Sequence, residues 1–143
     1  SEKYQLRHWD WDRPKVFREF IALVNRVRRE NPALQSDNRL RFYPTDNEQL
    51  VCYAKSTPDL SNVVLCVVNL DPHHTQSGWV RLPVGEFGLA AGDSYQVQDL
   101  LTGAHFLWSG EANFVALDPK VTGAHVLRLR KKLRTERDFD YFM

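Results

Sequence analysis

Short apolar runs separated by turn residues fill the chain from residue 39 onward, and this pattern constrains the fold more than any other feature. The runs are rich in β-branched and aromatic residues and recur roughly every ten residues, which is typical of an antiparallel sandwich or barrel. The candidate strands lie at residues 39–43, 49–55, 63–70, 78–83, 94–99, 104–108, 113–117 and 124–130. Because residues 63–68 are apolar throughout, we expect this strand to be central and covered on both faces.

One segment, residues 14–31, has a helical period instead. Its apolar residues recur at spacings of three and four along one face: Val16, Phe20, Leu23, Val24 and Val27. Pro14 suits the first turn, and we expect Asp10 or Asp12 to cap the start. Asn31 and Pro32 should end the helix. The fold class is therefore mainly β, an antiparallel β-sandwich preceded by one amphipathic helix.

The apolar face of this helix is wider than one neighbour requires. Phe17 and Ile21 extend it beyond the stripe of about 100° that a helix lying on a single sheet buries. Two interpretations stay open. These two residues lie at the edge of one large contact, or the helix also packs on a second body that this chain does not contain.

Length and charge exclude several classes of function. The 143 residues make one domain and are too few for a complete (β/α)8 barrel, which needs at least about 200. The 19 basic and 18 acidic residues give a net charge of +1, so no basic excess points to a nucleic-acid or anionic-membrane partner. No run approaches the roughly 18 apolar residues of a membrane span, and residues 1–12 do not read as a signal peptide. We expect a cytoplasmic protein.

The two cysteines leave a disulfide open. Cys52 and Cys66 lie in neighbouring candidate strands, and a register that pairs Lys55 with Val63 would place the two thiols opposite each other. Two cysteines are nevertheless too few for the disulfide-rich pattern of small secreted domains. Buried free thiols are common in cytosolic proteins. We therefore favour two buried thiols.

No self-sufficient active site is recognisable in the sequence. His73 and His74 are adjacent in a turn and lack a further ligand at a known metal spacing. His8, His105 and His125 are better explained as surface or hydrogen-bonded strand residues. Nucleophile-elbow, dinucleotide-binding and phosphate-loop motifs are not found. The sequence predicts no catalytic residue, metal or cofactor.

The aromatic residues are the remaining candidates for ligand contact. Trp79 and Trp108 occupy strand positions, where we expect inward rings that fill the sandwich. Trp9 and Trp11 precede the helix in a loop, where a ligand or surface contact is more plausible. The last stretch is a basic run at 128–134 followed by acids and aromatics at 136–143. Its aromatic residues favour an ordering contact, with the sandwich of this chain, with a neighbouring body or in a lattice.

Several strings resemble the α-amylase superfamily. Trp9, Asp10, Pro14, Ile21, Asn25 and Arg28, followed by Asn31-Pro32-Ala33-Leu34, are similar to the last barrel helix and barrel exit of that superfamily. One branch is closer, the maltosyltransferases that use maltose 1-phosphate to extend α-1,4-glucans. The segments of this chain that resemble that branch are Asn62 to Asp71 with Pro72-His73-His74, residues 76–80 and 99–103, and the closing stretch 136–142.

The resemblance implies a C-terminal piece of such an enzyme. Residues 1–34 would then be the end of a catalytic barrel, 35–130 a C-terminal β-sandwich of α-amylase type and 131–143 a tail. The family's aspartate nucleophile and glutamate acid/base would form a covalent maltosyl-enzyme intermediate, and both would lie upstream of this chain. The implied partners are the missing barrel, a second copy in a homodimer, and an α-glucan through the parent enzyme.

A barrel helix of about 17 residues carries the chain about 25 Å from the catalytic rim, so the sandwich should begin far from the chemistry. In the intact enzyme, the residues on the rim side would be Tyr4, His8, Trp9 and Trp11. We expect this chain alone to be inactive, with a structural role on the barrel. The alternatives are another α-amylase-superfamily parent, such as a hydrolase or a trehalose-forming isomerase, a carbohydrate-binding module, and a protein-interaction domain.

Overall fold

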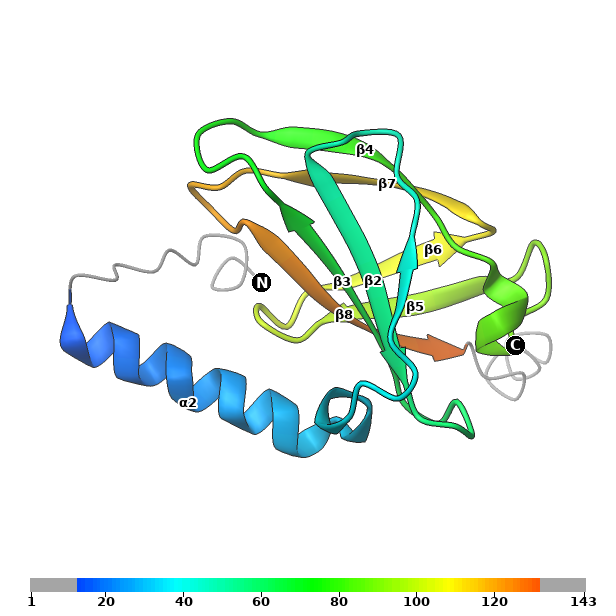
Figure 1. Cartoon of the computed structure of the whole chain (residues 1–143), viewed down its shortest axis with the longest axis horizontal. Coiled ribbons are helices and arrows are strands. Elements are labelled where there is room, and N and C mark those ends of the chain that lie inside the picture. The colour runs from blue at the N-terminus through cyan, green and yellow to red at the C-terminus, as the bar shows by residue number, and fades with distance from the viewer. Residues whose placement is uncertain (1–12, 132–143) are drawn as a thin grey trace, which may run out of the picture.

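One helix followed by an antiparallel β-sandwich makes up residues 13–131, the part of the chain that the computed structural model describes (Figure 1). The elements are α2 (Pro14–Glu30), η1 (Pro32–Gln35), β1 (Arg41–Tyr43), β2 (Leu50–Ser56), β3 (Val63–Asn69), β4 (Gln76–Arg81), η2 (Val84–Phe87), β5 (Ser94–Asp99), β6 (His105–Ser109), β7 (Ala112–Leu117) and β8 (Ala124–Lys131). Every predicted strand is present, with ends no more than two residues from those predicted. The predicted fold class is confirmed.

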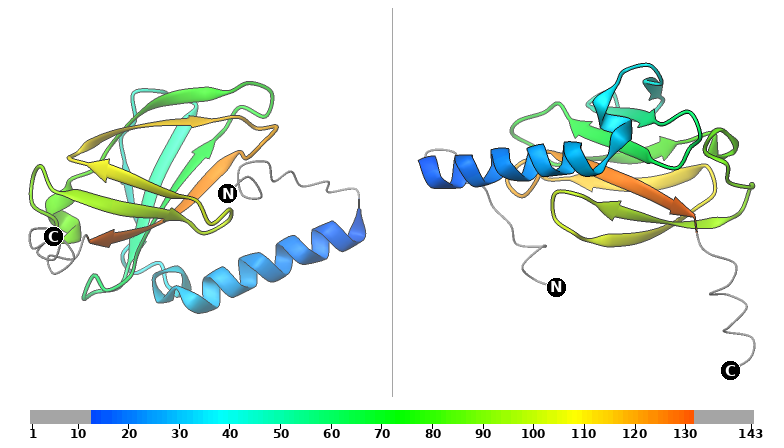
Figure 2. Two further views of the ribbon diagram at one scale, coloured as in Figure 1. Left: turned by 180° about the vertical axis from the view of Figure 1, so that it is seen from behind. Right: turned by 90° about the horizontal axis from the view of Figure 1, so that it is seen from below.

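Two sheets form the sandwich. Strands β1-β2-β3-β8-β5-β6 make the larger sheet, and β4 and β7 make a two-stranded sheet that covers one of its faces (Figures 1 and 2). Inward side chains of both sheets meet in one core, whose fully buried members include Leu65, Val80, Tyr95, Leu117 and Leu127. Each such side chain contributes about 1.5–3 kcal/mol when it leaves water.

Strand β3 is the centre of the larger sheet. Its neighbours are β2 and β8, and six of its seven residues are buried. Leu65 and Val67 point into the main core, whereas Val64 and Cys66 join a second, smaller cluster on the opposite face of the sheet. The prediction of a central strand covered on both faces is confirmed.

The register between β2 and β3 separates the two cysteines. Lys55 pairs with Val64, so the register that matched it with Val63 is wrong by one residue. Because side chains alternate between faces, this single step places Cys52 in the main core and Cys66 in the cluster on the other face. Both are buried free thiols, as favoured from the sequence, and burial raises the pKa of Cys52 to about 12.

Helix α2 starts and ends close to the predicted positions. Its N-cap is Arg13, without a side-chain capping hydrogen bond. Asp10 and Asp12, the expected capping residues, lie outside the described residues. Figure 2 shows that the N-terminal half of the helix extends beyond the edge of the sandwich. Within residues 13–131, no helix is both long and apolar enough to span a membrane.

Candidate functional site

The α2 apolar face is only partly covered by the sandwich. Its residues are Val16, Phe17, Phe20, Ile21, Leu23, Val24 and Val27. Val27 is the one buried residue within α2, all of which the structure describes, and Ile21 remains 42% exposed. The helix touches the rest of the fold mainly at its C-terminal end (Figure 1). Within residues 13–131, the sandwich therefore leaves this face exposed at Ile21.

A pair of buried asparagines attaches the helix to the sandwich. The Asn31 Nδ2 donates to the carbonyl of Val27 at 2.9 Å, and its Oδ1 accepts a hydrogen bond from Asn62 Nδ2 at 3.0 Å. Asn62, directly before β3, also accepts from the backbone N–H of Ala33 at 2.9 Å. Asn31 and Asn62 are 1% and 3% exposed, so these bonds are shielded from water. They fix the direction in which α2 leaves the sheet.

Helix η1 covers the sheet face next to this attachment. Ala33 packs with Val64 and Cys66, and Leu34, Tyr53 and other partly buried residues border the cluster. Gln35 Nε2 donates to the carbonyl of Arg28 at 3.0 Å and so satisfies one of the open acceptors at the helix end. The sequence did not reveal the role of Asn62, because its partners are 29 and 31 residues away.

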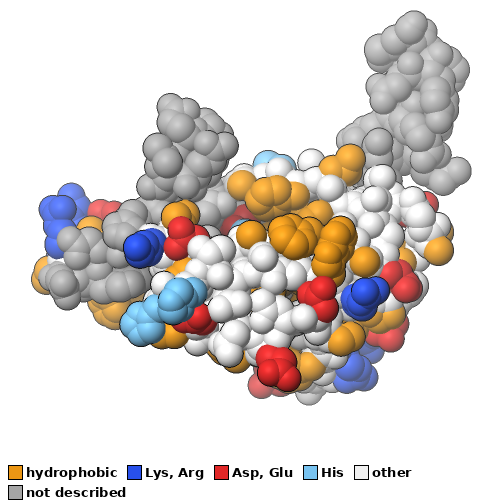
Figure 3. Space-filling model, turned by 90° about the horizontal axis from the view of Figure 1, so that it is seen from above, with side chains coloured by type: hydrophobic (Ala, Val, Ile, Leu, Met, Phe, Trp, Pro, Cys, Tyr) orange, Lys and Arg blue, Asp and Glu red, His pale blue; other side chains and the backbone are white. Residues whose placement is uncertain are grey.

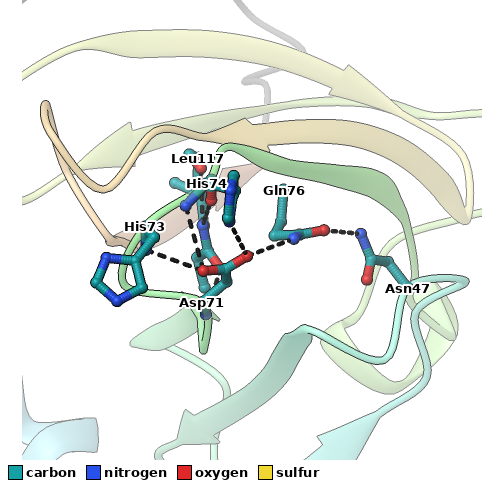
Figure 4. Close-up of polar contacts among 7 residues, drawn as sticks. Asn47, Asp71, His73, His74, Gln76 and Leu117 are labelled. Carbon is teal, nitrogen blue, oxygen red and sulfur yellow. Dashed lines mark hydrogen bonds and ion pairs between the residues drawn. The ribbon is translucent and has the colours of Figure 1, made fainter.

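Asp71 organises the turn that carries the histidine pair (Figure 4). Its Oδ1 accepts from the backbone N–H groups of His73 and His74, and its Oδ2 contacts Gln76 Nε2 at 2.9 Å and His74 Nδ1 at 3.1 Å. These donors, the His73 backbone first and the Gln76 side chain next, lower the pKa of Asp71 to about 2. Asn69 ties the turn to β7 by donating to the carbonyl of Leu117 at 2.9 Å.

The contacts of this turn stabilise the path of the chain, and they do not form a metal site among the described residues. The rings of His73 and His74 lie 6.4 Å apart at 80°, so they do not converge on one point. Among residues 13–131, no group of three or more His, Cys, Asp or Glu side chains is arranged to hold a metal ion. All the polar contacts of Asp71 instead shape the chain between β3 and β4.

A second carboxylate and histidine meet at the end of β5. Asp99 is 1% exposed, accepts from the backbone N–H of Leu101 at 2.9 Å and contacts His125 Nδ1 at 3.0 Å. The ring of Phe106 packs edge-on against His125. His125 is thus a hydrogen-bonded strand residue, as expected, while its pairing with Asp99 was not predicted.

The two strand tryptophans differ in orientation. Trp108 is 8% exposed and packs against Tyr95 in the core, which confirms its inward position. Trp79 is 44% exposed, so the prediction of an inward ring is wrong for this residue. Its strand neighbours Gly78 and Val80 face the core, and alternation therefore directs Trp79 outward.

Some predicted site residues lie outside the described part of the chain. These are the candidates for a position near substrate, Tyr4, His8, Trp9 and Trp11, and the aromatic tail at 136–143. The arrangement of residues 13–131 itself offers a docking surface on α2 and an exposed aromatic pair on β4 and β7.

Comparisons with known proteins agree with this geometry. A maltosyltransferase from Chlorobaculum tepidum, "Alpha-1,4-glucan:maltose-1-phosphate maltosyltransferase", is 42% identical over 135 residues, which cover 90% of this chain and 20% of the relative. The protein of the same name from Corynebacterium glutamicum is 42% identical, covering 96% of this chain and 21% of the relative. The chain thus spans about a fifth of the length of these relatives.

Solved structures share the fold at low identity. A maltogenic α-amylase from Thermotoga neapolitana superposes with a TM-score of 0.61 at 11% identity, covering 82% of this chain and 26% of that protein. An α-amylase from Geobacillus thermoleovorans gives 0.60 at 15% identity, over 85% and 24%. At these identities the likeness concerns the fold alone.

The family model described as "GLGE, C-terminal" matches residues 42–129, from β1 to β8. That range covers more than half of the chain and almost the whole sandwich. The resemblance to maltosyltransferases found in the sequence is thereby confirmed, and the chain belongs to the GLGE C-terminal family.

Proposed function

We propose that this chain is the non-catalytic C-terminal part of a maltosyltransferase that transfers maltosyl units from maltose 1-phosphate to the non-reducing end of α-1,4-glucans. The names of the curated relatives and the family match support this proposal. The carboxylates of the reaction would belong to the part of the enzyme outside this chain. The role of the chain is to complete and cover the catalytic barrel.

The partial exposure of the α2 apolar face at Ile21, Val16, Leu23 and Val24 is the observation that carries the proposal. Ile21 is exposed, and Val16, Leu23 and Val24 are only partly buried, although burial of one such side chain contributes about 1.5–3 kcal/mol. A barrel wall would bury this face. We therefore assign residues 1–34 to the end of the barrel, 35–130 to the sandwich and 131–143 to a tail, and the family match at 42–129 fits inside the sandwich.

This assignment separates the sandwich from the chemistry. Helix α2 has 17 residues and so carries the chain about 25 Å from its start to its end. In a (β/α)8 barrel such a helix runs away from the catalytic rim. We therefore place the segment before α2, with Tyr4, His8, Trp9 and Trp11, as the part of this chain nearest to the substrate.

The compartment and assembly of the enzyme are part of the proposal. The buried free thiols Cys52 and Cys66 support a reducing compartment, and we propose a cytoplasmic enzyme. We also propose a homodimer of the whole protein. Light scattering of the full-length enzyme tests this, and a monomeric mass over the micromolar range would contradict it.

Another α-amylase-superfamily parent is the main competing function. The solved structures with the same fold are α-amylases, but at 11% and 15% identity. The maltosyltransferases are several times more similar in sequence. Phosphate release from maltose 1-phosphate by the full-length protein separates the two, because a hydrolase or an isomerase of this superfamily does not need that donor.

Docking on the barrel is tested with the two parts expressed separately. We expect the chain alone to release no phosphate and to bind the upstream part of the protein. Ile21→Asp should weaken that binding at least about tenfold, since a buried charge without a partner is costly. Val121→Asp is the matched control, because Val121 is similarly exposed, at 45%, but lies in the loop between β7 and β8 and not on α2. Turnover by the chain alone, or equal binding by both variants, would overturn the proposal.

A further inference from the structure

The outer face of the β4–β7 sheet carries an exposed aromatic pair that is separate from the α2 apolar face. Trp79 of β4 and Phe114 of β7 are opposite each other in the register and are 44% and 53% exposed. Figure 3 shows hydrophobic side chains gathered near the middle of this face, with charged side chains at its margin. The face lies across the sandwich from α2 (Figure 1).

The two rings are inclined to each other. Their centroids are 5.5 Å apart and their planes make an angle of 67°. The same face of β7 carries small side chains on either side of Phe114, namely Ala112 and Ala116. The two aromatic rings therefore project further from the sheet than the side chains beside Phe114. The pair therefore presents two apolar surfaces at an angle to each other.

The backbone beneath Trp79 is held firmly. Its N–H donates to Asp46 Oδ1 at 2.8 Å, and its carbonyl accepts from the N–H of Asp46 at 3.3 Å. Gly78 permits this close approach, because a Cβ there would lie 2.5 Å from Asp46 Oδ1. A backbone that is fixed before binding does not add to the conformational entropy lost when a ligand arrives.

Polar groups beside the rings lack partners within residues 13–131. The Ser77 hydroxyl and the Arg81 guanidinium project on the same face as Trp79 without a side-chain hydrogen bond, and Asp46 Oδ2 has none either. Donors and acceptors around an aromatic surface match a sugar, which has an apolar ring face and a hydroxylated edge.

We propose that Trp79 and Phe114 form an auxiliary binding surface for an α-1,4-glucan chain, with Asp46, Ser77 and Arg81 contacting its hydroxyls. The inference rests on the proposed function, which makes an α-1,4-glucan the acceptor of the enzyme. An α-1,4-linked chain is curved, so successive glucose units present their apolar faces at an angle, as the two rings require. Two rings flanked by alanines and polar groups are a small surface for a protein partner, whose stable interface buries about 800 Å² per side.

The test uses the full-length protein, with glycogen-affinity electrophoresis and with titration of maltoheptaose and cellohexaose. We expect Trp79→Ala and Phe114→Ala each to weaken glycogen retention about tenfold, whereas Trp79→Phe keeps most of it. Leu107→Ala is the matched control, because Leu107 is 68% exposed on β6, outside the pair. Maltosyl transfer to a short acceptor should not change in any of these variants.

Three outcomes would overturn the inference: glycogen retention of Trp79→Ala equal to that of the unaltered protein, cellohexaose binding as tightly as maltoheptaose, or a change in molecular mass without a change in retention. Failure of the proposed function gives a different result, since the unaltered protein would then release no phosphate from maltose 1-phosphate. Glycogen retention is measured independently of that reaction.

Discussion

Asp71 is held in its charged form by donors from the turn that follows it. The backbone of His73 and the side chain of Gln76 make the largest contributions to its low pKa of about 2. An unfolded aspartate titrates near pH 3.9, roughly two units higher. The charged carboxylate therefore stabilises the folded state at neutral pH, and this contribution disappears as the pH falls through the folded pKa.

Asp71→Asn should remove this contribution. The amide oxygen can still accept from the backbone N–H groups, but the amide nitrogen cannot accept from Gln76 or His74. We expect the melting temperature of the variant to be lower than that of the unaltered chain above about pH 5. The difference should shrink between about pH 4 and pH 2. Thermal unfolding followed by circular dichroism measures it, and a difference that stays constant down to pH 2 would contradict the assignment.

Residue identity alone misplaced Trp79 for a specific reason. Strand β4 has one large apolar residue on each face, Trp79 on one and Val80 on the other. Gly78 has no side chain, so the sequence of the strand does not show which face points into the core. The face that points inward is set by Leu117 and Val115 on the paired strand β7 and by the hydrogen bond to Asp46, all of which are distant in sequence. The prediction for Trp108 was correct, although β6 also has apolar residues at alternate positions on both faces, with Leu107 between Phe106 and Trp108.

At the scale of elements, the attachment of α2 depends on the asparagine pair. Asn62→Ala removes the acceptor of the Ala33 N–H and the donor to Asn31 Oδ1, and leaves both buried groups without that partner. Each such loss costs about 1–3 kcal/mol. We expect a lower free energy of unfolding in urea and faster amide exchange at residues 27–34. Asn38→Ala is the control, since Asn38 is exposed and its side chain makes no hydrogen bond within residues 13–131. Equal exchange in both variants would show that the pair does not fix the helix.

Strands were easier to predict than their pairing. Alternation and turn residues define each strand locally, and β5 was therefore placed at its observed bounds. The register between β2 and β3 depends instead on the turn at 57–62, where the Thr57 N–H donates to the Asn62 carbonyl at 3.0 Å. A shift of one residue there reverses every side chain, which is why the cysteines appeared able to face each other.

At the scale of the whole molecule, the candidate site was predicted only in outline. The width of the helix face raised the possibility of a second packing partner, because that signal is a local pattern in the sequence. The exposed aromatic pair joins β4 with β7, whose paired residues Trp79 and Phe114 are far apart in the chain. Such pairings follow from topology, and no local pattern specifies them.

The proposed boundary after residue 34 predicts that the sandwich folds without α2. Within the described residues 13–30, deletion of residues 1–30 removes one buried side chain, Val27, and it keeps Asn31 with its bond to Asn62. We expect the shortened chain to retain its β-sheet circular dichroism and a cooperative transition, with a loss of about 1–3 kcal/mol and a melting temperature lower by a few degrees. Binding of a hydrophobic dye should decrease, because the α2 apolar face is gone. A control deletion that also removes β1 should unfold the edge of the larger sheet. If the chain without residues 1–30 is already unfolded, α2 belongs to the sandwich, and its apolar face cannot be assigned to a barrel.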